Sequence, residues 1–258
     1  MKKLIIVSLA ILLCLPAVAY AATIGGTETQ GKGKLSIGLD QEFVFNRDME
    51  FVKETGYSIT PGSSLQDVEI NDINRTMIKA SYGVIDNLDI YVRLGIANLN
   101  EQDRWYVNGN YDSQQNLTGK CASAYGLGLK YTYPLGDKWL LGVDAQYLRH
   151  RNSYSGKWTI DDSPWQGHMT IQEWQIAPYV ARRIGNFIPY LGVKYSDLRL
   201  LDKGNDNSQT GWNTTHKAEH NCGVFLGTDF KIGGHWKLNI EGRFIDETAM
   251  SIGAAYKF

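Results

Sequence analysis

Apolar and polar residues alternate with a period of two along most of this chain. From 88 to 96 every even position is apolar, whereas the odd positions hold Asp89, Tyr91, Arg93 and Gly95. The same rhythm recurs at 125–133, 139–147, 224–231, 236–244 and 251–258. A period of two places successive side chains on opposite faces of a β-strand and fits a helix poorly. The sequence therefore predicts an all-β protein whose strands have one apolar and one polar face.

Short and long connections between these runs alternate along the chain. Tight-turn signals rich in Gly, Asn and Asp stand at 85–87, 134–137, 184–186 and 232–234, and long polar stretches at 46–72, 98–120, 149–170 and 202–219. We expect about ten strands, at 34–45, 73–84, 88–97, 121–133, 139–148, 171–183, 187–200, 221–231, 236–245 and 248–258. Eight or twelve strands are the alternatives, the latter with an extra hairpin in the first long stretch. This order predicts a closed antiparallel up-and-down barrel with four tight turns at one end and five external loops at the other, the last of them short, around Asp246 to Thr248.

The first residues predict export. Lys2 and Lys3 precede a short apolar run at 4–15, and Ala19-Tyr20-Ala21 has the small-x-small pattern of a signal peptidase site. We expect a signal peptide at 1–21, too short to be a membrane anchor, and one barrel domain at 22–258. The formal net charge of the 258-residue chain is −1, so no basic excess points to nucleic acid. The mean hydropathy of −0.29 excludes a protein with many membrane-spanning helices.

Two features favour a membrane barrel over a soluble one. The polar phase of the strands is rich in glycine, which suits a narrow lumen, as at Gly95, Gly128, Gly142 and Gly227. The apolar phase carries aromatic residues near both strand ends, as expected of two interfacial belts. The fold class that follows is a closed transmembrane β-barrel.

The chain ends in Ala-Ala-Tyr-Lys-Phe, with Tyr256 two residues before the terminal Phe258. With the export signal and the alternating connections, this resembles small single-chain bacterial outer-membrane β-barrel proteins. The resemblance implies a C-terminal insertion signal at Tyr256 and Phe258 and residence in the bacterial outer membrane. It also implies contact with outer-membrane lipid and lipopolysaccharide, delivery by periplasmic chaperones, insertion by the barrel assembly machinery, and periplasmic tight turns and termini.

Charged residues of both signs share the polar phase. A salt-bridged lumen is the simplest interpretation, and we expect its network to include Arg93, Lys130, Asp144, Arg183, Lys194, Asp229, Glu241 and Arg243. Tyr91, Tyr179, Tyr190 and Phe225 are expected inside as well, so ten strands leave little open space. A narrow porin-like channel is the alternative.

For function, the sequence favours a non-enzymatic envelope or surface-contact protein. The second and third long stretches carry the aromatic residues Trp105, Tyr106, Tyr111, Tyr154, Trp158 and Trp165, which either bind a partner or pack over the lumen. An omptin-like or lipid-modifying enzyme is less favoured because no Asp-x-His or Asp-x-Asp spacing marks a strand end. No cofactor is expected.

The histidines suggest two further kinds of site, a metal site and a contact with lipopolysaccharide. His216 and His220 could share a metal ion only outside an extended strand, because four residues of strand span about 13 Å. His150, between Arg149 and Arg151, is expected in a basic rim cluster that contacts lipopolysaccharide.

Cys121 and Cys222 are the cysteines left after export. The periplasm favours a disulfide, but their expected strands are nearly opposite and a bridge needs Cα atoms within about 7 Å. A disulfide thus stays possible only if the strand ends bend together. Pro178 and Pro189 both fall in the lipid-facing phase of neighbouring strands, where we expect a local bulge near the 184–186 turn.

Overall fold

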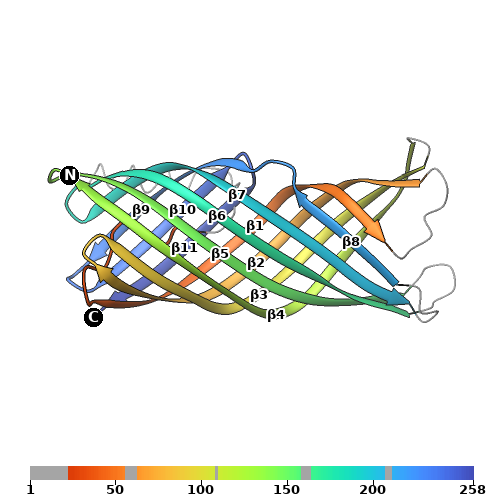
Figure 1. Ribbon diagram of the computed structural model, residues 1–258, viewed down its shortest axis with the longest axis horizontal. Helices are drawn as coiled ribbons and strands as arrows, with labels where there is room; N and C mark the ends of the chain where they lie inside the picture. The colour runs from red at the N-terminus through yellow and green to blue at the C-terminus, as the bar shows by residue number, and fades with distance from the viewer. Residues whose placement is uncertain (1–22, 56–62, 108–109, 158–163, 207–210) are drawn as a thin grey trace, which may run out of the picture.

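A computed structural model describes residues 23–55, 63–107, 110–157, 164–206 and 211–258, so the expected signal peptide lies outside the described residues. These described residues form eleven antiparallel strands (Figure 1). They are β1 (Leu35–Thr55), β2 (Ser63–Ile85), β3 (Leu88–Val107), β4 (Asn110–Leu135), β5 (Trp139–Lys157), β6 (Pro164–Arg182), β7 (Phe187–Asp206), β8 (Gly211–Ala218), β9 (Cys222–Ile232), β10 (Trp236–Phe244) and β11 (Thr248–Lys257).

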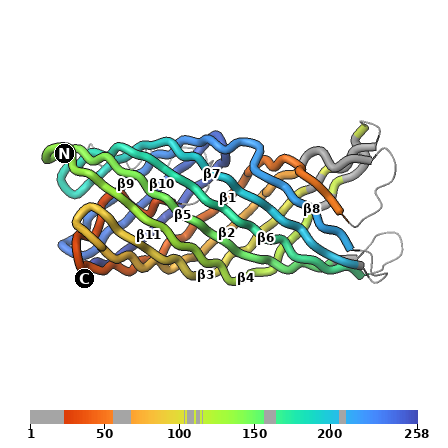
Figure 2. The backbone as a smooth tube through the Cα atoms, viewed as in Figure 1, coloured from red at the N-terminus to blue at the C-terminus, as the bar shows by residue number. Residues whose placement is uncertain are grey.

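The sheet closes on itself twice. Toward the tight turns, β11 pairs with residues 36–46 of β1 and β9 pairs with residues 187–195 of β7, which closes a ring of ten strands. Toward the other end, β8 pairs with residues 49–55 of β1 and 199–205 of β7, which closes a ring of eight. The predicted antiparallel barrel of about ten strands is confirmed. We call its two ends the turn end, at left in Figure 2, and the loop end.

The β10–β11 hairpin explains the change from ten strands to eight. Its turn at 245–247 ends halfway up the barrel, and beyond it β8 and β1 pair directly. Asp246 and Glu247 of this turn are buried. The turn expected to face outside is therefore folded into the barrel.

The long polar stretches are mostly strand, which corrects the expectation of long loops. β1 to β7 run for 19 to 26 residues each. The alternation continues through the polar stretches with its polarity reversed: in β3, Arg93 is buried and Leu94 exposed, whereas farther on Leu99 is buried and Asn100 partly exposed. A barrel wall has apolar residues outside where lipid surrounds it and polar residues outside where water surrounds it. The wall therefore continues beyond the membrane as a water-exposed extension.

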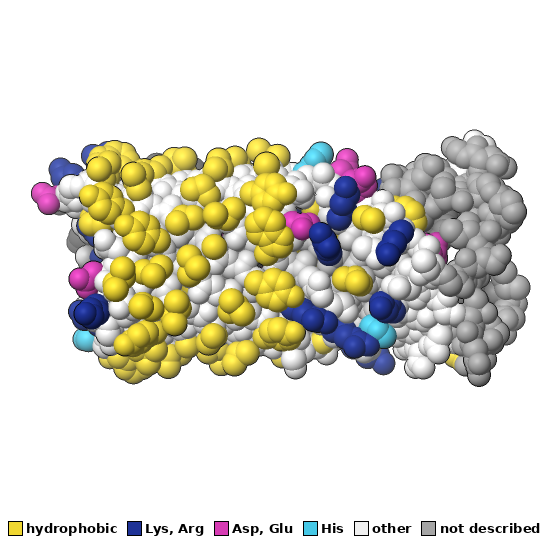
Figure 3. Space-filling view, in the orientation of Figure 1, with side chains coloured by type: hydrophobic (Ala, Val, Ile, Leu, Met, Phe, Trp, Pro, Cys, Tyr) yellow, Lys and Arg dark blue, Asp and Glu magenta, His cyan; other side chains and the backbone are white. Residues whose placement is uncertain are grey.

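The outer face shows where the membrane lies. Exposed apolar side chains such as Leu94, Leu127 and Leu191, each at least 60% exposed, form a band from the turn end to past the middle (Figure 3). A band this large cannot face water. Trp139 and Trp236 near the tight turns and Trp174 farther up are also exposed, which matches the predicted belts. Among the described residues, no helix is long and apolar enough to cross a membrane.

The bulge predicted near the 184–186 turn is not seen, because Ile184 bridges Phe187 across that turn in the register of the β6–β7 ladder. The ladder skips 177 and 178 but resumes in the same register, since Ile176 faces Tyr195 and Tyr179 faces Gly192. The ring of Pro178 removes one donor, which the long ladders on either side tolerate.

Candidate functional site

The N-terminal segment 23–33 occupies the lumen at the turn end, with residues 23–30 buried or half-buried inside the barrel and residues 32 and 33 exposed at its rim, and we call it the plug. The backbone N–H of Thr27 donates to Asp229 at 2.7 Å, and that of Gln30 donates to Asp89 at 3.0 Å. Lys130 donates to the carbonyl oxygens of Ile24 and Gly26. From Thr23 to Gln30 the plug is thus bonded to lumen side chains, whereas at Gly33 its backbone N–H donates to the carbonyl oxygen of Gly83 on β2 at 2.8 Å.

Apolar contacts hold the plug as well. Ile24 is 1% exposed and belongs to a buried cluster with Tyr179, Tyr190 and Phe225, among others. Tyr179 donates to the carbonyl oxygen of Thr27 at 2.8 Å. The aromatic residues expected in the lumen, including Tyr91, are all buried there.

A layer of ion pairs fills the middle of the lumen, and we call it the central layer. Arg47 contacts Glu173 at 2.8 Å and Glu247 at 3.0 Å, while Arg75 contacts Glu42 at 3.3 Å and Glu173 at 3.4 Å. All five side chains are at most 2% exposed. Burial at this level is tolerated only because each charge has opposite partners.

The predicted network residues fall into three groups. Arg93, Lys194, Glu241 and Arg243 belong to the central layer, with Arg93 3.5 Å and Arg243 3.6 Å from Glu42, Arg243 3.4 Å from Glu241, and Lys194 2.9 Å from Asp246. Lys130, Asp144 and Asp229 lie lower, around the plug, and Lys130 is 3.7 Å from Asp144. Arg183 lies apart from both, partly exposed at the rim of the turn end, and binds Glu28 at 2.9 Å.

Sequence reasoning missed several central-layer residues. Arg47 lies in a stretch taken for a loop, and Asp246 and Glu247 in a turn taken for an external one. Arg75 could have been predicted from the sequence. Every second residue of this strand points into the lumen, and Arg75 follows Lys79 and Met77 in that series.

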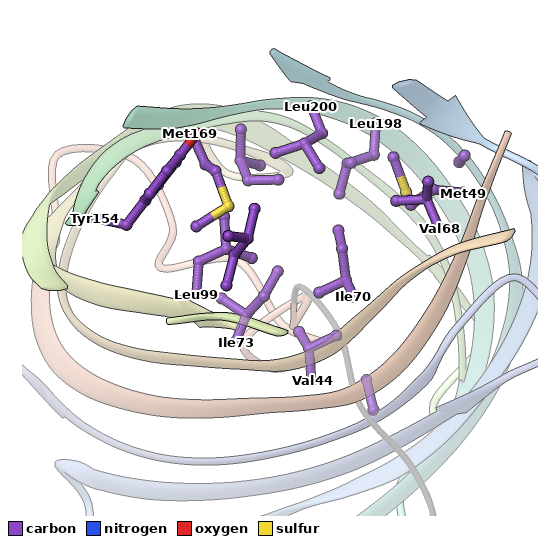
Figure 4. Close-up of a cluster of buried hydrophobic side chains, with 14 residues drawn as sticks. Val44, Met49, Val68, Ile70, Ile73, Leu99, Tyr154, Met169, Leu198 and Leu200 are labelled. Atoms are coloured by element: carbon purple, nitrogen blue, oxygen red, sulfur yellow. The ribbon is translucent and has the colours of Figure 1, made fainter. Parts of the chain in front are cut away.

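Above the central layer, apolar side chains gather in the lumen beside a few buried polar groups such as His150 and Asn152. Figure 4 shows side chains from several strands converging in the loop-end part of the barrel, among them Ile70, Ile73, Leu99, Met169 and Leu200. Each of these five is fully buried. We call this group the outer apolar cluster, and it fills the eight-stranded part of the barrel as a core fills a soluble protein.

A hydrogen-bonded group lies over this cluster. The hydroxyl of Tyr154 and the indole N–H of Trp212, the latter at 2.9 Å, both donate to the carboxylate of Asp202. The ring of Trp165 packs against both aromatic rings, at centroid distances of 5.5 and 6.5 Å. Burial raises the pKa of Asp202 to about 6, although the two hydrogen bonds act to lower it.

The aromatic residues of the second and third long stretches fall into two sets, those that cover the lumen and those that the structure does not describe. Tyr154 is buried and Trp165 packs inward, so these two cover the lumen. Trp158 and the side chains of Trp105, Tyr106 and Tyr111 lie outside the described residues.

The histidine expectations are corrected. His150 is buried in the lumen with its Nδ1 2.6 Å from Asn152, because alternation turns it away from Arg149 and Arg151. His216 is buried against Phe51, while His220 is exposed. Burial lowers the pKa of His216 to about 4. Within the described ranges, no group of three or more His, Cys, Asp or Glu side chains could hold a metal ion.

On the face shown in Figure 3, Lys and Arg side chains gather just beyond the apolar band, with a few acidic side chains among them. Lys120, His168 and Lys203 line a depression of about 430 Å³ with Ser153 and Asn205, among others. Arg151 donates to Nε2 of His168. Partial burial, Arg151 and Lys203 together lower the pKa of His168, which indicates a positive potential there.

Cys121 and Cys222 are both exposed, and neither is bonded in this structure. Cys121 lies inside β4 instead of opening a strand, and Cys222 begins β9. The strands β5, β6 and β7 separate them along the ring.

Comparison with known proteins agrees with the barrel. The outer membrane protease OmpT of Escherichia coli is similar over 86% of this chain and 97% of its own, with a TM-score of 0.54 and 13% identity. The translocator domain of the autotransporter NalP of Neisseria meningitidis (88% and 90% covered, TM-score 0.46, 11% identity) and OprG of Pseudomonas aeruginosa (90% and 99%, 0.40, 12%) are more distant. No curated protein matches the sequence.

At these identities the structural likeness shows the fold alone. The sequence profile of the family described as "Outer membrane protein beta-barrel domain" matches residues 94–258, which is more than half of the chain. The protein resides in the bacterial outer membrane, in contact with its lipid. This chain belongs to the outer membrane protein beta-barrel family.

Proposed function

We propose that this protein is a closed, non-catalytic barrel that serves the outer membrane as a structural and surface-contact protein. The observation that carries the proposal is the continuous filling of the lumen by the plug, the central layer and the outer apolar cluster. A water-filled channel needs a polar path along its whole length, and the outer apolar cluster interrupts it.

The carboxylate of Asp202 at the loop end has structural partners, which supports a non-catalytic role. It accepts hydrogen bonds from the hydroxyl of Tyr154 and the indole N–H of Trp212. A general base needs a free lone pair within reach of a substrate proton. The oxygens of Asp202 instead hold the extension together, and His150, whose Nδ1 contacts Asn152, is buried inside the barrel.

The extension and the basic depression form the contact surface of the proposal. Arg151, His168 and Lys203 lie just beyond the apolar band, at the level where the phosphates of lipopolysaccharide gather. Guanidinium and ammonium groups bind phosphate by charge-assisted hydrogen bonds. Delivery by periplasmic chaperones and insertion through Tyr256 and Phe258 by the barrel assembly machinery are part of the same proposal, as are periplasmic termini.

Planar-bilayer recording of the purified protein tests the closed lumen. We expect no steady conductance, with a wide porin in the same bilayers as the positive control. A stable open conductance would instead favour the narrow porin-like channel, the alternative function.

Binding of lipid A in micelles tests the contact surface. Arg151→Ala with Lys203→Ala should weaken binding of diphosphorylated lipid A by about tenfold or more, because each replacement removes a charge-assisted contact. Lys32→Ala with Lys34→Ala, at the turn end, is the control. Equal binding of dephosphorylated lipid A by the unmodified protein would contradict the proposed role of charge.

A further inference from the structure

Basic side chains line the lumen where it opens at the turn end. Arg183 directly follows β6, and one lysine lies in the turn-end part of each of β9, β10 and β11: Lys231, Lys237 and Lys257. All four border hollows that are also lined by the plug residue Glu28. We call these four basic residues the mouth cations.

The mouth cations already bind one anionic group. The carboxylate of Glu28 lies 2.9 Å from Nε of Arg183 and 2.7 Å from Nζ of Lys231. These are the short contacts of charge-assisted hydrogen bonds. One side of the mouth is therefore an anion site that the plug itself fills.

The other side of the mouth has the same chemistry without an anion. Among the described residues, Lys237 and Lys257 form no ion pair, and both are half-buried. Lys237 lies against the plug, since a Cβ at Gly26 would clash with its Nζ, and its cross-strand partner is Lys231. Like charges directly opposite each other destabilise an antiparallel pair, and a partly buried ammonium without a partner is unfavourable. A bound anion would remove both effects.

Two buried carboxylates of this part of the lumen serve the plug instead. Asp229 accepts hydrogen bonds from the backbone N–H and the hydroxyl of Thr27, at 2.7 and 2.8 Å. Asp89 accepts the backbone N–H of Gln30 at 3.0 Å. The charges of Lys237 and Lys257 are therefore left for a ligand from outside the chain.

A hollow of about 140 Å³ lies beside these two ammonium groups. The cations that line it are Lys231, Lys237 and Lys257, and Ser36, the cross-strand partner of Lys257, adds a hydroxyl group. Pockets for whole small molecules measure about 300–1,000 Å³, so this hollow suits a small free anion or one anionic group of a larger molecule. Lysine ammonium groups bind phosphate as point charges, whereas planar carboxylates pair best with the fork of arginine. The hollow therefore favours a phosphate group.

We propose that Lys237 and Lys257, with the hydroxyl group of Ser36, bind a phosphate group at the turn-end mouth of the barrel. Glu28 borders this site, but its charge is balanced by the two mouth cations that hold it. A lipid headgroup and a free phosphorylated compound present the same oxygens, so both are sources of the phosphate. The site lies at the opposite end of the barrel from the basic depression and goes beyond the function proposed above.

Titration with two probes tests the site and identifies the source of the phosphate. The protein is held in a sugar detergent, which carries no phosphate, at constant NaCl concentration so that the screening of charge stays fixed. Inorganic phosphate, followed by phosphorus NMR, represents a free anion, and phosphatidylglycerol added to the micelles represents a lipid headgroup. We expect saturable binding of at least one probe. Binding of neither probe would overturn the proposal.

Charge variants locate the bound phosphate. Lys237→Gln with Lys257→Gln should weaken binding of the probe by about tenfold or more, because each replacement removes a charge-assisted contact. The matched control is Lys32→Gln with Lys138→Gln, which removes two exposed charges from the same end and should leave binding unchanged. Heat-modifiable gel mobility verifies first that both variants are folded.

An equal loss of binding in the two variants would show a diffuse attraction to positive charge and would overturn the site, as would unchanged binding in the first variant. Lipid A binding at the loop end is measured with replacements of Arg151 and Lys203. The phosphate site and the contact surface can therefore fail independently.

Discussion

The phenol ring of Tyr179 on β6 lies directly over Gly142 of β5, its cross-strand partner. A Cβ at 142 would come within 2.1 Å of the ring, and the same ring carries the hydroxyl that donates to the plug at Thr27. Tyr190 over Gly227 and Tyr154 over Gly167 repeat the arrangement. The glycines of the inward phase therefore make room for aromatic rings, and aromatic rings over glycine stabilise sheets in this way.

Gly142→Ala should lower the free energy of unfolding by about 1–3 kcal/mol, because the added methyl group overpacks the lumen. Heat-modifiable gel mobility and urea unfolding in detergent would measure the loss. Gly234→Ala is the control, since a Cβ there meets no atom within 4 Å. Equal stability of Gly142→Ala and the unmodified protein would show that the ring can move aside.

Glu173→Gln should destabilise the barrel by about 3–5 kcal/mol, because it leaves Arg47 and Arg75 without their shared carboxylate. Glu50→Gln breaks the exposed pair with Lys217, at 3.1 Å, and should cost less than about 1 kcal/mol. Urea unfolding of both variants provides the comparison. A small effect of Glu173→Gln would mean that water reaches the central layer.

Asp202 should make stability fall as pH rises. Its folded pKa of about 6 exceeds the ordinary value of 3.8, so the folded state binds more protons between these values. The contribution of Asp202 is fully present below about pH 4 and is lost as pH rises through about 6. His216, with its pKa lowered to about 4, acts in the opposite direction, losing stability as pH falls below its ordinary 6.5.

The difference between unmodified protein and Asp202→Asn isolates the Asp202 contribution. Its free energy of unfolding should change by about 2–3 kcal/mol between pH 4 and pH 7, relative to the variant. Urea unfolding across this range is the measurement. Parallel pH profiles for the two proteins would contradict the raised pKa.

Cys121 and Cys222 should stay reduced, because three strands lie between β4 and β9. Non-reducing mass mapping of purified protein should find two free thiols, and maleimide should modify both in detergent. Cys121→Ser, which should leave one reactive thiol, is the control. Isolation of a linked pair of peptides would require the strand ends to bend together over the lumen.

The alternation by itself determined the class of fold, the tight turns and the inward phase of most lumen residues. In a membrane barrel successive residues of a strand face lipid and lumen in turn. The side on which Arg93 or Tyr179 lies therefore follows from its position in the two-residue alternation. Arg183 shows the limit of counting, because phase says nothing about depth and this side chain lies at the rim.

Only the tertiary structure decided what fills the barrel. The plug has no alternating pattern, because its partners are side chains from strands up to 217 residues away in sequence. The extension was not predicted as strand because its surroundings change from lipid to water. The two-residue alternation continues there, but apolar side chains now point inward and polar side chains outward. The central layer forms where inward-facing charged side chains from different strands lie at the same level along the barrel axis, as Arg47 and Glu173 do. Strand register and ring closure set that height, and local sequence encodes neither.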